Sequence, residues 1–366
     1  MGWTLGKILE GARDRGASDI HLIRGVAPVL RVNGEIHVSQ GKPLDEVALD
    51  EIIDKLLLPK QREVLQERLQ LCFSRHIDGV GRFRVSIYYH AGCPEAAIRL
   101  CEKTVRTAAE LGLPPIVEEL SRLPNGLVLV TGPTGVGKTT TLNFMIDLIN
   151  HNRRAKIVTI EDPVEFVHDN LRSIIVQQEV GTDVRSFREA LVHVLRQDPD
   201  VIVIGEMRDL ETIETALIAA ETGHLVLATL HTPDTVQTIQ RIYSVFPGNQ
   251  QNAIIVQLSS TLQAAIAQNL LPRADGHGRV IACEVLVSTP AVRNHIRERK
   301  EFNLYSEMQM GRKLQMQTMD SALLALYQKG EISYDLALSY AREPDFVRHQ
   351  TGDMTKLPTA GKGWKV

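Results

Sequence analysis

One stretch of the chain, GPTGVGKTT at residues 132–140, limits the possible folds more than any other. It fits the pattern G-x-x-x-x-G-K-[ST] and stands between an apolar run, LVLV, and a helical stretch, TTTLNFMIDLIN. In such a strand–loop–helix unit, backbone N–H groups and a helix N-terminus surround phosphate groups. The stretch therefore predicts a phosphate-binding loop in an α/β fold.

The side chains of this loop have separate expected roles. The glycines allow the backbone to turn inward around phosphates, Lys138 would reach the β- and γ-phosphates, and the Thr139 hydroxyl would bind Mg²⁺. A glycine-rich turn without a ligand is the alternative interpretation. The predicted phosphate-binding residues are Gly132, Pro133, Thr134, Gly135, Val136, Gly137, Lys138, Thr139 and Thr140.

Around and after this loop, four apolar runs of the kind that form buried strands alternate with helical stretches. They are LVLV (127–130), KIVTI (156–160), VIVI (201–204) and LVLATL (225–230). Continuous apolar strands separated by helices are typical of a parallel sheet with helices on both faces.

Acidic residues follow two of these runs. KIVTI is followed by Glu161, and VIVI by Gly205 and Glu206. Nucleotide sites need acids near the metal ion and the attacking water, at the carboxyl ends of neighbouring parallel strands. We expect Glu161 to polarise that water and Glu206 to lie in the shell of the Mg²⁺ ion or to orient the water. Two ordinary solvated carboxylates are the alternative, and the sequence leaves open which glutamate is the general base.

A histidine stands at each end of LVLATL, His224 before it and His231 after it. Seven positions along an extended strand correspond to roughly 23 Å, and an odd separation places the two rings on opposite faces. They therefore cannot share one metal ion. His231, at the carboxyl end, is expected to sense the γ-phosphate or to hold the catalytic residues in register, with a structural role as the alternative. His224 is expected to pack or to couple the far edge of the sheet.

The part of the chain before this sheet reads as a small mixed α/β unit. Residues 4–15 have helical apolar spacing, and strands are expected around IHLIRG, PVLRVNGEIHV, GRFRVSIYYH and AAIRLC. Asn-Gly at 33–34 predicts a tight hairpin turn. Leu-Gly-Leu-Pro-Pro at 111–115 is the expected linker. The predicted division is 1–110, linker 111–115, 116–345 and a mobile tail at 346–366.

Composition excludes several classes of protein. The 366 residues are 43% hydrophobic and 23% charged, with a formal net charge of −3, so a dominant nucleic-acid surface is not expected. No apolar run approaches the ~18 residues that span a bilayer, and the first residues lack a signal peptide's apolar core. Cys72, Cys93, Cys101 and Cys283 form no C-x-x-C pair, which argues against a zinc ribbon. A cytoplasmic protein is expected.

Four motifs in order, GPTGVGKTT, TIEDPVEF, VIVIGEMRD and GHLVLATLHT, resemble the Walker A, Asp box, Walker B and His box of the secretion-type P-loop ATPases. The resemblance extends over nearly the whole chain, including ASDIHL (17–22) and LRQDPDV (195–201). TPAVRNHIRERK (289–300) and GRKLQMQTMDSAL (311–323) resemble the C-terminal motifs of the pilus retraction (PilT) branch. The absence of a large N-terminal extension and of a tetracysteine insertion also favours this branch. Departures from the family pattern fall at Val136, Val292, His295 and Cys72.

The resemblance implies a PAS-like N-terminal α/β domain and a C-terminal RecA-like P-loop ATPase domain with a mainly parallel sheet. It implies ATP and Mg²⁺ as ligands and a homohexameric ring. Arginines of the N-terminal domain would complete the site of a neighbouring subunit. Arg82 and Arg84 in GRFRVSI, two apart on one strand face, and Arg99 in AAIRLC are the candidates, with a solvated charged face as the alternative.

The same resemblance implies a biological role. The ring would drive type IV pilus retraction, with pilin disassembly and twitching motility, through an inner-membrane platform protein. It would lie at the inner face of the cytoplasmic membrane and touch the membrane only through partners, with no nucleic acid bound. Residues 291–298 would form an exposed polar helix that transmits motion. The alternatives are an accessory retraction paralogue, a RecA-like nucleic-acid motor and a non-catalytic nucleotide-binding scaffold.

Overall fold

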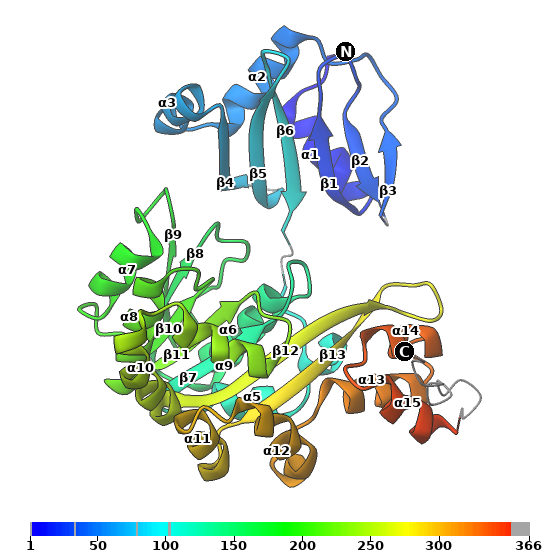
Figure 1. The fold of residues 1–366 in the computed structure, drawn as a ribbon. Helices are drawn as coiled ribbons and strands as arrows, with labels where there is room; N and C mark the ends of the chain where they lie inside the picture. The colour runs from blue at the N-terminus through cyan, green and yellow to red at the C-terminus, as the bar shows by residue number, and fades with distance from the viewer. Residues whose placement is uncertain (1, 33, 78–79, 102–103, 353–366) are drawn as a thin grey trace, which may run out of the picture. The chain divides into compact units, whose positions relative to one another are not determined.

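The computed structural model describes residues 2–32, 34–77, 80–101 and 104–352, and the chain divides into two compact units (Figure 1). Unit 1 comprises Met1–Val105, Ile160–Asp169 and Gln177–Ser186, and unit 2 comprises the remaining residues. This division differs from the predicted one. The expected linker at 111–115 belongs to unit 2, where Leu113 is buried, and two segments that follow the ATPase-type strands group with the N-terminal residues.

Unit 1 is built on an antiparallel sheet with strand order β3-β2-β1-β6-β5-β4. Its elements are α1 (Leu5–Asp14), β1 (Ala17–Leu22), β2 (Val29–Val32), β3 (Glu35–Val38), α2 (Glu46–Leu56), α3 (Pro59–Arg68), β4 (Gln70–Ile77), β5 (Gly81–His90) and β6 (Cys93–Leu100).

Alternation of apolar and polar residues explains how this sheet buries one face. Phe83, Val85 and Ile87 of β5 are buried together with apolar residues of α1 and α2, while the residues between them face outward. The helix expected at 4–15 and the predicted hairpin are confirmed, since Val32 of β2 pairs with Glu35 of β3. Helix α3 and strand β4 were not predicted. Pro59 begins α3, because proline fits the first turn of a helix.

Unit 2 carries most of a seven-stranded sheet with strand order β13-β12-β7-β11-β10-β8-β9. Every helix among the described residues is too short or too polar to cross a lipid bilayer. The elements from residue 106 onward are α4 (Ala108–Leu111), α5 (Ile116–Ser121), β7 (Gly126–Thr131), α6 (Lys138–Asn152), β8 (Lys156–Glu161), β9 (Ile174–Glu179), α7 (Phe187–Val194), β10 (Val201–Ile204), α8 (Leu210–Glu221), β11 (Leu225–Leu230), α9 (Thr235–Ser244), α10 (Gly248–Thr261), β12 (Leu262–Pro272), β13 (Arg279–Val287), α11 (Pro290–Arg297), η1 (Glu301–Asn303), α12 (Leu304–Met310), η2 (Gly311–Leu314), α13 (Met319–Gln328), α14 (Tyr334–Tyr340) and α15 (Pro344–Thr351).

The strand order explains how helices cover both faces of the second sheet. The crossover through α6 leads from β7 to β8 in one direction along the sheet, and the crossover through α8 leads from β10 to β11 in the other. Because parallel crossovers are right-handed, helices that travel in opposite directions lie on opposite faces. Strands β12, β7, β11 and β10 are parallel neighbours in this order, and β13 pairs antiparallel with β12. The predicted fold class, an N-terminal α/β domain followed by a mainly parallel sheet, is confirmed.

The C-terminal helices are held by a buried aspartate. Asp320, at the start of α13, is fully buried and accepts hydrogen bonds from the Tyr305 hydroxyl and from the backbone N–H groups of Arg342 and Glu343. These two residues lead into α15, where Val347 is fully buried. A mobile tail was expected at 346–366, but residues 346–351 belong to helix α15. Residues 353–366 lie outside the described part of the chain.

Replacing Asp320 with alanine should destabilise this helical end, because the Tyr305 hydroxyl and two backbone N–H groups would lose their buried acceptor. We expect a loss of about 2–4 kcal/mol of folding free energy, seen as a lower melting temperature. Asp335→Ala, at an exposed site in α14, is the matched control and should melt like the unmodified chain. Equal melting of both variants would contradict the assigned role of Asp320.

Candidate nucleotide-binding site

The carboxyl ends of three parallel strands bring the predicted site residues of unit 2 together. Thr131 of β7 pairs with Leu230 of β11, and Ile204 of β10 pairs with Ala228 of the same strand. The residues that follow these strand ends, the phosphate loop, Glu206 and His231, therefore leave the sheet at one edge. Ligands of α/β sheets bind at this edge.

The glycines of the loop, Gly132, Gly135 and Gly137, have positive φ, the region that favours glycine. Gly132 has φ +138°, and a Cβ there would lie 2.5 Å from the backbone oxygen of Gln268. Gly137 has φ +94° and forms the N-cap of α6, which has no side-chain cap. Val136, the departure from the family pattern, is buried, with its methyl carbon directed at Gly132. The N-terminus of a fifteen-residue helix is thus left open to an anion.

Lys138 is buried and folds back over this loop. Its Nζ donates to the backbone oxygens of Gly132, at 2.7 Å, and Pro133, at 2.9 Å, and lies 3.4 Å from His231 Nδ1. Burial lowers the pKa of the Lys138 ammonium, and the negative charge of Glu206 opposes this effect. Thr134 and Thr139 are exposed beside the buried lysine, so the hydroxyl expected to bind Mg²⁺ faces solvent.

Glu206 lies between two basic side chains. His231 Nε2 is 2.7 Å from Glu206 Oε1, and the Arg208 guanidinium donates to the same oxygen. Burial alone would raise the pKa of Glu206, but Arg208 and His231 outweigh it and hold that pKa below its ordinary value. The carboxylate therefore stays ionised at neutral pH. Lys138, His231 and Glu206 form one continuous line of contacts beside the loop.

His224 lies at the other end of β11. Its Nδ1 is 2.9 Å from the Ala219 backbone oxygen, and its own carbonyl accepts from the Gly126 N–H. This is a contact with the last turn of α8, where a carbonyl lacks a partner within the helix. The two histidines therefore have separate surroundings.

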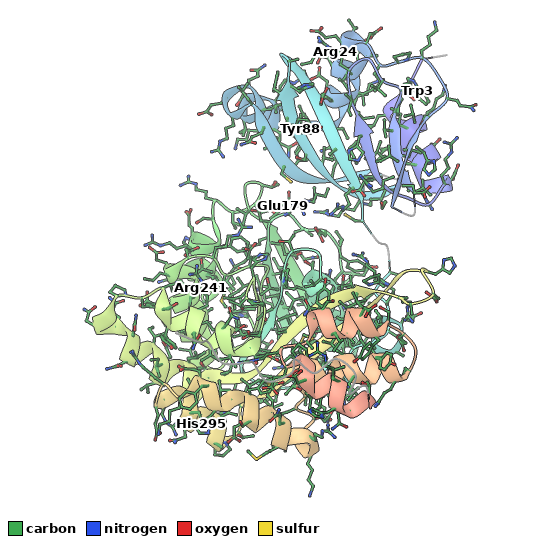
Figure 2. The ribbon with its side chains drawn as sticks, turned by 45° about the vertical axis from the view of Figure 1, so that its right-hand side comes forward. Trp3, Arg24, Tyr88, Glu179, Arg241 and His295 are labelled. Carbon is green, nitrogen blue, oxygen red and sulfur yellow. The ribbon has the colours of Figure 1, made fainter. Side chains whose placement is uncertain are left out.

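Glu161, the last residue of β8, belongs to unit 1 by its contacts. Its side chain is buried, and its Oε1 accepts a hydrogen bond from Gln177 Nε2 at 3.1 Å. The loop after it is held by Glu179 of β9 (Figure 2), which accepts from the Val164 N–H at 3.1 Å. Hydrogen bonds from β9 therefore hold both Glu161 and the loop that follows it within unit 1.

Unit 1 also brings the three candidate arginines onto one face of its sheet. Arg84 and Arg99 are direct cross-strand neighbours on β5 and β6, and Arg82 lies two residues before Arg84. Arg82 donates to the Val164 oxygen at 2.8 Å and pairs with the buried Glu179. Arg84 pairs with Glu165 at 3.2 Å, and Arg99 with Asp19 at 2.8 Å. Their side chains are 21%, 40% and 63% exposed in the order Arg82, Arg84, Arg99, so Arg82 is the one most engaged within its own chain.

Three residues of these clusters were missed by sequence reasoning. Arg208 stands two positions after Glu206 in the same GEMRD stretch, so the motif itself contained the signal. Gln177 and Glu179 lie in the polar second half of β9, after a short apolar run at 174–176. Only the folded chain shows that they contact the segment after Glu161.

The helix predicted at 291–298 is observed one position earlier, as α11 at Pro290–Arg297, and it is more firmly anchored than expected. Helix α11 buries Val292 and Ile296, and Arg293 donates to the Ser260 oxygen at 2.9 Å. His295, which departs from the family pattern, lies 3.2 Å from Glu307 of α12. Arg297 is exposed.

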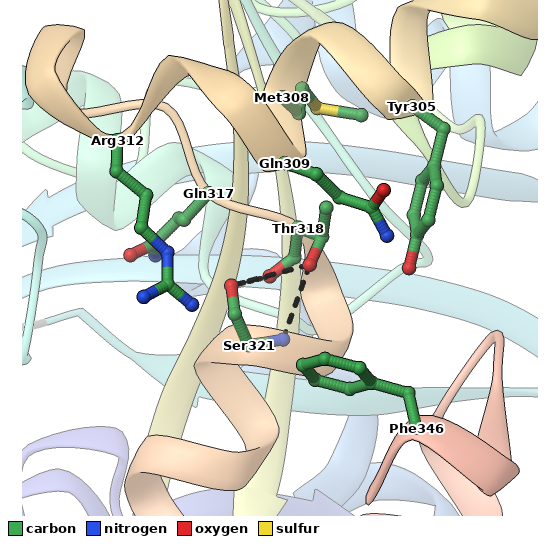
Figure 3. A pocket seen from close by; sticks show the side chains of 8 residues that line it. All are labelled: Tyr305, Met308, Gln309, Arg312, Gln317, Thr318, Ser321 and Phe346. Carbon is green, nitrogen blue, oxygen red and sulfur yellow. Dashed lines mark hydrogen bonds between the residues drawn. The ribbon is translucent and has the colours of Figure 1, made fainter.

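A pocket of about 320 Å³ lies elsewhere in unit 2, between α12, α13 and α15 (Figure 3). None of the predicted site residues lines it. Its lining comprises Tyr305, Met308, Gln309, Arg312, Gln317, Thr318, Ser321 and Phe346.

The residues at the strand edge fit a nucleotide with Mg²⁺. A glycine that no larger residue can replace, an open helix N-terminus and a buried lysine suit phosphate groups. An exposed threonine hydroxyl and one ionised carboxylate are oxygen donors, which Mg²⁺ prefers alongside phosphate oxygens and water.

Comparison with known proteins agrees with this geometry. The family described as type II/IV secretion system protein matches residues 3–349. The chain is 44% identical to the type IV pilus retraction ATPase PilT of Pseudomonas aeruginosa, over 93% of this chain and 98% of that protein. It is 43% identical to a twitching motility protein of Neisseria gonorrhoeae, over 87% of this chain and 85% of the relative.

The chain belongs to the PilT family of secretion-type ATPases. Solved structures of the family have the same fold. A crystal structure of the pilus retraction motor PilT with bound ADP has a TM-score of 0.89 and 44% identity, covering 95% of this chain and all of that one. The Legionella pneumophila ATPase DotB has a TM-score of 0.80 and 27% identity, covering 92% of this chain and 95% of that one. The expected family is therefore confirmed.

His231→Ala should slow ATP turnover without weakening nucleotide binding, because it removes a partner of Glu206 and leaves the phosphate loop intact. We expect kcat to fall by at least about tenfold. Steady-state kinetics and an ADP titration separate the two effects.

The matched control is His224→Ala at the other end of the same strand. It should keep the turnover of the unmodified chain. If both variants lose the same activity, His231 has only a structural role.

Proposed function

We propose that the chain is a subunit of an ATP-hydrolysing motor that drives type IV pilus retraction, with pilin disassembly and twitching motility as its result. The observation that carries the proposal is the line of contacts from Lys138 through His231 to Glu206 beside the phosphate loop. It occurs in a chain that matches a pilus retraction ATPase over nearly the full length of both proteins. ATP and Mg²⁺ are the proposed ligands.

The proposed roles follow from the charge of each group. The open N-terminus of α6 and Lys138 would bind the phosphates, and Thr139 with Glu206 would hold the Mg²⁺ ion, which neutralises phosphate charge when bound. Glu206 is already fixed by two basic partners and its pKa is low, so it suits an ionised ligand or an orienting group. Glu161 then takes the proton of the attacking water.

The motor is proposed to be a homohexameric ring in which arginines of one subunit complete the site of the next. Arg99 and Arg84 are the better candidates, because their side chains are more exposed than that of Arg82. Arg82 is proposed to act first within its own subunit, through its contacts with Glu179 and Val164. A guanidinium from a neighbour would stabilise the charge of the transferred phosphoryl group.

The proposed partner is the inner-membrane platform protein of the pilus, with the ring in the cytoplasm at the inner face of the cytoplasmic membrane. Helix α11 would transmit the motion, since Val292 and Ile296 anchor it while Asn294 and Arg297 are exposed. Contact with the membrane would pass through partners, and no nucleic acid is involved.

An accessory retraction paralogue is the second candidate function. The chain is 39% identical to the type IV pilus ATPase PilU of Pseudomonas aeruginosa, over 93% of this chain and 90% of that protein. Restoration of twitching in a strain that lacks its principal retraction ATPase separates the two functions. A principal motor restores it alone, whereas an accessory one does not.

ATP turnover per subunit should rise with protein concentration and then saturate, because each site is completed by a neighbour. The measurement is specific activity over a dilution series without nucleic acid, with Arg99→Ala as the variant that should stay low throughout. An appreciable activity that does not change on dilution would contradict assembly of the site between subunits.

Arg297→Ala should uncouple ATP hydrolysis from pilus retraction. Among the described residues, this exposed arginine of α11 contacts none of the catalytic groups. We expect unchanged ATP turnover and loss of twitching in cells. A variant that twitches normally would remove Arg297 from the transmitting surface.

A further inference from the structure

Gln177 on β9 makes three hydrogen bonds that hold the segment after β8. Its Nε2 donates to Glu161 Oε1 at 3.1 Å and to the Phe166 backbone oxygen at 2.8 Å. Its Oε1 accepts from the His168 N–H at 2.9 Å. The amide therefore uses both of its protons and its oxygen on one short segment.

These partners allow only one orientation of the amide. A flipped side chain would place its oxygen against two acceptors, the Glu161 carboxylate and the Phe166 carbonyl. It would also place the NH₂ group against the His168 N–H, which is a donor. The network thus requires that a proton of Gln177 points at Glu161.

The neighbouring groups hold this arrangement in place, and the histidine ring beside it carries no charge. Glu179, on the same face of β9 as Gln177, accepts the Val164 N–H and ties down the same segment. The rings of Phe166 and His168 pack with centroids 4.6 Å apart. Burial lowers the pKa of His168 to about 4, so its ring is neutral throughout the working pH range.

We propose that Gln177 is a positioning residue for ATP hydrolysis, which fixes the carboxylate of Glu161 in the orientation that accepts the proton of the attacking water. This inference rests on the proposed function and extends it to a strand outside the four motifs. The donated hydrogen bond favours the ionised carboxylate, the form that a general base requires. Gln177 touches neither nucleotide nor water in this role, and acts through Glu161 alone.

The test compares Gln177→Leu and Gln177→Glu in the full-length protein. Gln177→Leu removes the donor while keeping the size of the side chain, so kcat should fall at least about tenfold with little change in KM for ATP or in ADP affinity. Gln177→Glu places a second carboxylate beside Glu161. Like charges favour a shared proton, so the acid limb of the pH–rate profile should move to higher pH.

Gln178→Leu is the matched control. Gln178 has the same side chain one position later, on the opposite face of β9, and its Oε1 has no hydrogen-bond partner among the described residues. This variant should keep the turnover and pH profile of the unmodified chain. Melting temperatures of all the variants identify any loss of folding.

Glu161→Gln, measured in parallel, distinguishes the possible failures. If it is as active as the unmodified chain, the proposed role of Glu161 fails, and the role of Gln177 fails with it. If it is inactive while Gln177→Leu keeps its kcat and Gln177→Glu keeps its acid limb, the inference about Gln177 alone is overturned. A fall in kcat that only accompanies a lower melting temperature, with no shift in the acid limb, also overturns it.

Discussion

The parallel register of β7, β11 and β10 is the constraint on which the rest of the site depends. Because Thr131 pairs with Leu230 and Ile204 with Ala228, the chain leaves all three strands at one edge. Side chains from positions 138, 206 and 231 meet there without any local sequence relation. A shift of one residue in either pairing would turn the strand faces over and separate these groups.

The charges at this edge balance one another. Lys138 is buried, which disfavours its charge, and Glu206 is the acid that offsets this cost. Glu206 in turn is held by Arg208 and His231. A buried charge is costly unless it is paired, so each group of this set stabilises the next. The arrangement keeps an ionised acid beside the phosphate loop before any nucleotide arrives.

The arginines of unit 1 show that one residue type at similar spacing can serve different purposes. Arg82 is drawn into a buried pair with Glu179 and a backbone contact, which fixes the segment after Glu161. Arg99 lies on the same face, pairs with Asp19 and stays largely exposed. The strand pattern predicted a shared face for Arg82 and Arg84, and the pairing of β5 with β6 adds Arg99 to it. It carried no information on which of them the chain itself uses.

How far the sequence could predict this protein depends on the length scale of each feature. The phosphate loop, the strand–helix rhythm and the Asn-Gly hairpin could be read directly, because each depends on residues close together in the chain. The tail boundary could not, because Val347 is buried in a cluster with residues distant in sequence, such as Leu271. Strand β9 was missed because its apolar run is only three residues long, Ile174–Val176, and its second half, with Gln177 and Glu179, is polar.

The sequence by itself determined the chemistry that is available: the glycines with positive φ, the lysine, the two acids and the arginines. Only the tertiary structure decided how that chemistry is held. Glu206 gained His231, and Glu161 gained Gln177. The reason is physical, since a hydrogen bond acts over about 3 Å and depends on direction, and only the packing of distant strands sets such distances.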